Sequence, residues 1–172
     1  MIHGSASVRP HGSIVTPDGA IEWERATMTA VEISLVRNRL NRAIEATRER
    51  SVRRREQVAA AERAYDDFLS TVATPVTKLV ANSLKVENFA FSVFTPGRGL
   101  RLASDHRRDD YIEFALDTES DPPQVMGRTS RTRGSRTLTD DRPVKQGSPV
   151  EAITEEDVLA FLISALEPWF ER

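Results

Sequence analysis

Hydrophobic residues recur with helical spacing through residues 28–73, a segment that contains neither glycine nor proline. At about 100° per residue, apolar side chains fall in one angular sector and form a seam along its length. The seam residues are Ile33, Val36, Leu40, Ala43, Ile44, Val58, Ala61, Tyr65, Leu69 and Val72. The pattern predicts one amphipathic helix over residues 27–73, roughly 70 Å long at about 1.5 Å per residue. Because a compact domain of this size is roughly 30 to 40 Å wide, we expect the helix to extend beyond its own core.

The middle of this seam is polar. Thr47, Ser51 and Arg54 occupy its central positions, and residues 37–55 hold eight arginines against two glutamates, a net charge of +6. On a helical wheel these arginines surround the cylinder and do not form one stripe. That distribution favours a solvated helix over a surface fitted to a nucleic-acid groove. The sequence leaves open whether the helix breaks near residues 47–57.

Shorter periodic segments follow the long helix. Thr74 and Pro75 have the residue types of an N-cap and a first-turn proline, and they predict a second helix that ends near Val86. Strand-like runs come next, joined by connections too short for parallel crossovers. They cover residues 89–95, 100–103, 111–116, 124–129 and 135–139. Thr154, followed by three acidic residues, marks the start of a last helix that Pro168 is expected to end or kink.

These elements predict an α+β protein. A long N-terminal amphipathic helix and a short helix precede a four- to five-stranded antiparallel β-meander, which the C-terminal helix covers. We divide the chain into a flexible N-terminal arm (residues 1–26), the long helix (27–73) and an α+β domain (74–172).

The first 26 residues are rich in glycine, serine and proline and lack a sustained hydrophobic period, which is typical of a flexible arm. Val15, Ile21 and Trp23 are the residues there that would dock as a short strand or as a hook on a partner. Met28 is an alternative start of the chain, because the coherent pattern begins at that residue.

Composition removes several classes of function. The chain of 172 residues contains no cysteine, which excludes a disulfide scaffold, a thiolate nucleophile and a Cys-type zinc site. The net charge of −2 provides no global attraction to nucleic acid or anionic lipid. We find no apolar run of bilayer length and no signal-peptide core, so we expect a cytoplasmic protein without a membrane partner.

Asp105, His106, Asp109, Asp110 and Glu113 form the cluster that most resembles an active site. Carboxylates with an imidazole are able to bind a metal or exchange protons, but the cluster lies in a turn where charged residues collect because they face water. Gly97 and Gly99 fit a hairpin turn and lack the third glycine of a dinucleotide fingerprint. We therefore predict no catalytic residues, no metal, no cofactor, no small-molecule ligand and no enzymatic activity.

Two groups of arginines are candidates for phosphate contacts. The first lies on the long helix and the second in a predicted basic hairpin, where guanidinium groups would bind phosphate oxygens. They are Arg48, Arg50, Arg53, Arg54 and Arg55, and Arg128, Arg131, Arg133 and Arg136. The simpler interpretation of the hairpin is an edge whose charges discourage pairing with other sheets. The two groups would act together only if the fold brings them together.

An amphipathic helix longer than its own domain leaves apolar surface for a partner. The leading hypothesis is a non-enzymatic scaffold or assembly protein that forms a homo-oligomer or docks a helical protein partner. The expected interface residues are Ile33, Val36, Leu40, Ile44, Val58, Ala61, Tyr65, Leu69 and Val72. The alternative is an accessory protein that contacts nucleic-acid phosphates through the two arginine groups.

Overall fold

The computed structural model of the chain describes residues 30–171. The predictions for the N-terminal arm, including Val15, Ile21, Trp23 and Met28, lie outside the described residues. Two compact units meet between Arg50 and Ser51, and each is considered by itself below.

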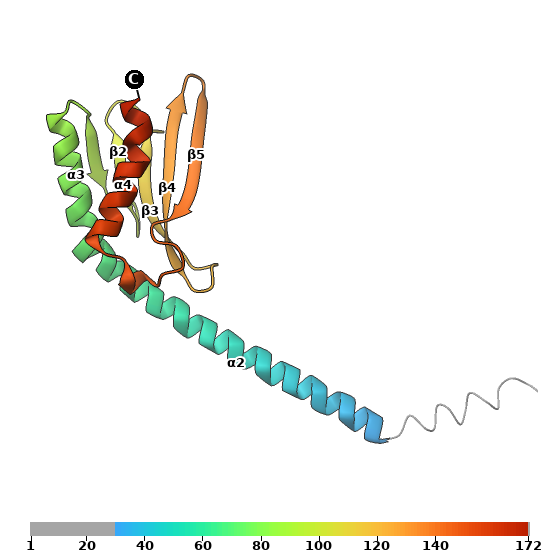
Figure 1. The fold of residues 1–172 in the computed structure, drawn as a ribbon. Helices are drawn as coiled ribbons and strands as arrows, with labels where there is room; N and C mark the ends of the chain where they lie inside the picture. Colours follow the sequence, from blue (N-terminus) through green and yellow to red (C-terminus); the bar gives the residue numbers. More distant parts are fainter. Residues whose placement is uncertain (1–29, 172) are drawn as a thin grey trace, which may run out of the picture. The chain divides into compact units, whose positions relative to one another are not determined.

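The second unit contains a five-stranded antiparallel sheet in which each strand pairs with the next along the chain (Figure 1). The predicted α+β class and the meander are therefore confirmed. The strands are β1 (Phe91–Phe94), β2 (Leu100–Ser104), β3 (Tyr111–Asp117), β4 (Gln124–Arg133) and β5 (Arg136–Pro143). The last two are longer than the sequence pattern predicts, because their pairing continues from Met126 with Pro143 as far as Arg133 with Arg136.

Helices α3 (Thr74–Val86) and α4 (Glu155–Phe170) pack together on the inner face of this sheet (Figure 1). The core lies between them and the sheet, because alternate strand residues such as Leu102, Ile112 and Phe114 point inward and are buried. Leu162 and Leu166 of α4 fill the same core.

Gly127 of β4 allows α4 to approach the sheet closely. A Cβ at this position would lie 2.1 Å from Cζ of Phe161, so the aromatic ring occupies the space of a side chain. The ring also packs against Phe114, with centroids 5.6 Å apart, and lies 5.0 Å from the guanidinium carbon of Arg142. One aromatic residue of α4 thus contacts the backbone of β4 and side chains of β3 and β5.

The long helix and the short one are joined differently from the prediction. Helix α2 (Ala30–Phe68) is continuous through residues 47–57, and a π-helical turn (Leu69–Ala73) leads directly into α3. The prediction that Thr74 is an N-cap is wrong, since its backbone is helical and its N–H donates to the carbonyl of Leu69 five residues earlier. The ring of Pro75 would clash with a carbonyl four residues before it in a regular helix, and a wider turn relieves that clash. The helical path therefore continues through Pro75.

The start of α4 is as predicted. The Thr154 hydroxyl accepts a hydrogen bond from the backbone N–H of Asp157, and the Asp157 carboxylate accepts one from the backbone N–H of Thr154, which together form a capping box. Lys145 Nζ lies 2.8 Å from the same carboxylate. The Lys145 ammonium and the donors of Thr154 lower the pKa of Asp157 to about 2. Pro168 does not end the helix, which continues to Phe170.

Candidate functional site

The N-terminal part of the predicted seam is exposed on α2. Ile33, Val36 and Leu40 are 59%, 56% and 56% exposed, and Ile44 is 44% exposed. These four side chains follow one another at intervals of three and four residues, so they lie on one face of the helix. We call these four residues the N-terminal seam.

The C-terminal part of the seam belongs to the core of the second unit. Ala61 and Tyr65 are buried, Val58 is half-buried, and Leu69 and Val72 pack partly buried against the core. The expected interface residues of the N-terminal seam are therefore exposed in the described chain, whereas the others are buried or partly buried.

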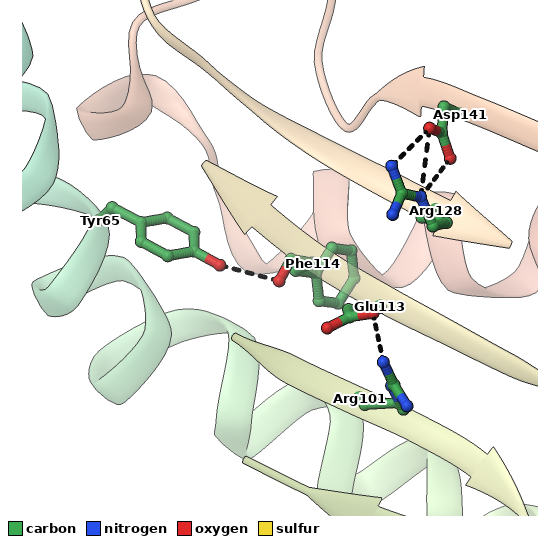
Figure 2. Close-up of polar contacts among 6 residues, drawn as sticks. All are labelled: Tyr65, Arg101, Glu113, Phe114, Arg128 and Asp141. Carbon is green, nitrogen blue, oxygen red and sulfur yellow. Dashed lines mark hydrogen bonds and ion pairs between the residues drawn. The ribbon is translucent and has the colours of Figure 1, made fainter. Parts of the chain in front are cut away.

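Tyr65 shows how α2 is attached to the sheet. Its hydroxyl donates a hydrogen bond of 2.8 Å to the backbone carbonyl of Phe114 in β3 (Figure 2). Burial raises the pKa of the Tyr65 hydroxyl, and the nearby carboxylates of Glu113 and Asp66 add to the rise. The side chain stays protonated and serves as a donor.

Several arginines of α2 have partners within the chain. Arg48 forms an ion pair of 3.0 Å with Glu45, and Arg50 donates to the hydroxyl of Thr47. Arg54 is half-buried, and its guanidinium donates to the carbonyls of Thr118 and Ser120 in the loop between β3 and β4. Arg54 therefore positions that loop.

Arg53 and Arg55 complete the helical group of predicted phosphate ligands, and both are exposed. The Nε of Arg55 donates to the carbonyl of Ser51, one helical turn before it. Arg37, Arg39 and Arg42, which lie between residues of the N-terminal seam, are also exposed.

The predicted basic hairpin is less uniform than its sequence. Arg128 and Arg131 lie within β4, three residues apart, so they point to opposite faces of the sheet. The Arg131 guanidinium donates a 2.6 Å hydrogen bond to the carbonyl of Pro168 at the end of α4. Arg133 and Arg136, the other two predicted ligands of this group, flank the turn between β4 and β5. Neither forms an ion pair within the described chain.

Within the second unit, Arg54 and the turn of the basic hairpin lie at opposite ends of β4. Arg54 contacts the loop that precedes this strand, whereas Arg133 and Arg136 flank the turn that follows it. A strand rises about 3.3 Å per residue, so the ten residues of β4 separate the two ends by roughly 30 Å. Within the second unit, the fold does not bring them together.

Charged residues of alternating sign cross the outer face of the sheet, which sequence reasoning missed. Arg101 of β2 pairs with Glu113 of β3 at 2.7 Å, and Arg128 of β4 pairs with Asp141 of β5 at 2.9 Å (Figure 2). Glu113 and Arg128 are register partners, which completes the row. These pairs balance one another's charge, and Asp141 accepts hydrogen bonds from Nε and Nη2 of Arg128.

The acidic cluster in the turn before β3 does not converge on one point. Asp105, His106 and Asp109 are exposed, and Glu113 faces Arg101 on the outer face. Asp110 is buried, and its carboxylate accepts a 2.6 Å hydrogen bond from the backbone N–H of Thr132 in β4. Among residues 30–171, no group of three or more carboxylate and histidine side chains is placed to hold a metal ion.

A groove between α3 and α4 was also missed from the sequence. It has a volume of about 660 Å³, and both helices contribute exposed apolar side chains to its walls, among them Leu79 and Ile163. The sequence signal was the unusual width of the apolar face of the last helix, where Leu159 and Ile163 lie beside the residues that enter the core. We call this feature the α3/α4 groove.

No described helix is long and apolar enough to cross a membrane. No protein-family model matches the chain, and comparisons with curated proteins and with solved structures find no match either.

Proposed function

We propose that this protein is a non-enzymatic assembly protein that associates through the N-terminal seam of α2. The observation that carries the proposal is the exposure of Ile33, Val36, Leu40 and Ile44 on one helical face. Amphipathic helices with apolar residues at this spacing commonly lay that face into an apolar groove of a partner.

The energetics favour a partner surface that is itself apolar. Full burial of an aliphatic side chain contributes about 1.5–3 kcal/mol, so four of them contribute on the order of 6–12 kcal/mol. Association costs about 4–15 kcal/mol in lost translational and rotational freedom. The seam offsets that cost only when its partner packs closely around it, which a wet polar surface does not do.

The test is the mass in solution, measured by light scattering over a range of concentrations, of the natural chain and of a Val36→Glu, Leu40→Glu variant. We expect an oligomer that the double substitution converts to a monomer, because two buried carboxylates have no partner in an apolar contact. Glutamate is a good helix former, so the helix itself should persist, which circular dichroism checks.

Leu35→Glu is the matched control. Leu35 is 51% exposed on the same helix but lies about 200° around it from Ile33, outside the seam. This variant should keep the mass of the natural chain. A natural chain that is monomeric at high concentration and captures no protein through a photo-crosslinker at position 40 in cells would contradict the proposal.

The charge of residues 37–55 favours a second candidate, an accessory protein that binds nucleic-acid phosphates. Arg37, Arg39 and Arg42 are exposed and lie close together on α2. Such contacts are indifferent to base sequence and weaken steeply with salt. This alternative is less supported, because Arg54, Arg128 and Arg131 form hydrogen bonds or ion pairs with other groups of the second unit.

A further inference from the structure

The α3/α4 groove has the form of a binding site for a helix. Its floor consists of buried core residues such as Val80, Leu84 and Leu166, so it is closed below. Its walls carry Leu79 and Ile163, which are 66% and 51% exposed. Large apolar side chains that are more than half exposed on both walls of one groove are typical of a surface that a partner covers.

The rim of the groove is acidic. Glu87 follows α3, and Glu155 and Glu156 begin α4, and all three line the groove and are exposed. No lysine or arginine is among the residues that line it. The groove therefore favours an apolar helix that carries positive charge beside its apolar face.

We propose that the α3/α4 groove of one copy of this chain receives the N-terminal seam of a second copy. This inference rests on the proposed function and names the partner surface. Residues 33–44 contain three arginines and no acidic residue, and one of them, Arg37, lies at the edge of the seam, so this segment is complementary in charge to the three glutamates of the rim.

The lengths also agree. On the α3 side the groove residues extend from Val76 to Glu87, the residue after the helix, which is about 17 Å at 1.5 Å per residue. Ile33 and Ile44 are separated by the same number of residues and therefore by about 17 Å on α2. One seam fills one groove from end to end.

Charge also argues against the simplest rival, in which two seams pack against each other. In an antiparallel pair, Arg37 of both copies, which lies about 55° around the helix from the centre of the seam, would lie at the same edge of the contact. Like charges at a helix–helix contact are destabilising, whereas the groove offers carboxylates at its edge. The groove is thus the better partner for the seam.

Crosslinking distinguishes the two arrangements, and the absence of natural cysteine makes it unambiguous. Leu40 and Ile163 lie near the middle of the seam and of the groove, so they should approach in either helix direction. We expect a tagged Leu40→Cys chain, mixed and equilibrated with an untagged Ile163→Cys chain, to form a mixed dimer with a short bis-maleimide. Leu35→Cys in place of Leu40→Cys is the control and should not.

A second measurement uses Leu79→Arg, which places a positive charge in the groove facing the arginine-bearing helix. The dissociation constant of the assembly should rise roughly tenfold or more, as for other central interface residues. Val86→Arg, at an exposed position on the same helix that does not line the groove, should leave it unchanged. Thermal unfolding checks that both variants fold.

The outcomes separate this inference from the proposed function. Crosslinking of Leu40→Cys with itself, together with normal association of Leu79→Arg, would overturn the groove as partner and leave assembly through the seam intact. A monomeric natural chain would overturn both. Mixed crosslinks and loss of association only in Leu79→Arg would support both.

Discussion

Asp110 is a buried residue just before β3, and its side chain joins β4 to α4. It accepts a 2.6 Å hydrogen bond from the backbone N–H of Thr132 in β4, and Trp169 Nε1 of α4 lies 3.4 Å from its second oxygen. Its own carbonyl accepts from the N–H of Ser104 in β2. The position in the fold gives this residue a structural role, although its neighbours in sequence resemble an acidic site.

Replacement of Asp110 by alanine should destabilise the protein by about 1–3 kcal/mol, because the N–H of Thr132 would lose its acceptor in a partly buried place. Asp110→Asn keeps an acceptor oxygen and should cost less. Asp109 is exposed, so Asp109→Ala should stay within about 0.5 kcal/mol of the natural chain. Urea unfolding measures all three, and equal losses for Asp109→Ala and Asp110→Ala would contradict this role.

The same residue shows what sequence reasoning misses. Asp105, Asp109 and Asp110 are the same residue type in one polar turn, so the sequence does not distinguish them. Only the pairing of β3 with β4 shows which of the three is buried. Likewise, Arg128 and Arg131 read as one basic cluster until the alternation of side chains along β4 places them on opposite faces. Contacts between residues distant in sequence decide these roles.

The start of α4 and the order of the strands are predicted correctly, because residue types near each element mark where it begins or ends. Thr154 and the acids after it identified the start of α4, and short turn-rich connections identified the meander. The residue types do not predict the junction of α2 and α3 correctly, because Thr74 and Pro75 indicate the start of a new helix. A π-helical turn accommodates a proline without ending the helical path, and no residue type signals such a turn reliably.

The start of α4 carries a prediction about pH. The folded state lowers the pKa of Asp157 to about 2, below the value of about 3.9 in an unfolded chain. The interactions of this carboxylate therefore stabilise the fold fully above about pH 4, and that contribution is lost as the pH falls towards 2. Thermal unfolding between pH 7 and pH 2 should show this decline.

Two variants isolate the effect. Asp157→Asn should lower the melting temperature at pH 7 and flatten the decline between about pH 4 and pH 2, because the titrating group is gone. Lys145→Met removes the ion pair while keeping the capping box, and it should reduce the decline without abolishing it. If the melting temperature of Asp157→Asn declines between about pH 4 and pH 2 as it does in the natural chain, other carboxylates cause the decline.

The sequence predicts the class of fold and the presence of an amphipathic helix. It does not predict which part of the apolar seam is buried in the core and which part is exposed. Tyr65 and Leu40 are equivalent on a helical wheel, yet one is buried in the core and the other is exposed. Periodicity tells which face of a helix is apolar, and only tertiary packing tells how much of that face the chain covers itself. The α3/α4 groove was not predicted, because it arises from two helices far apart in sequence.

Salt separates the two proposed functions of the molecule. An apolar seam in an apolar groove should hold its oligomeric mass from low salt to about 1 M, where the Debye length is about 3 Å. Salt weakens only the contacts between the seam arginines and the acidic rim, and exposed pairs of this kind contribute about 0–1 kcal/mol each. The association constant should therefore fall modestly.

Binding to phosphates behaves differently. The logarithm of its affinity falls with the logarithm of salt concentration by about 0.9 per phosphate contacted on duplex DNA. A chain that uses several arginines of residues 37–55 would lose its nucleic acid between low and moderate salt. Light scattering with and without duplex DNA across this range measures both effects.

A triple variant separates the seam from the arginines of the same helix. Arg37→Gln, Arg39→Gln and Arg42→Gln together should preserve most of the assembly. The same substitutions would weaken a complex held by phosphates, because they remove three of the eight arginines of residues 37–55. Loss of assembly in this variant at all salt concentrations would contradict an apolar contact.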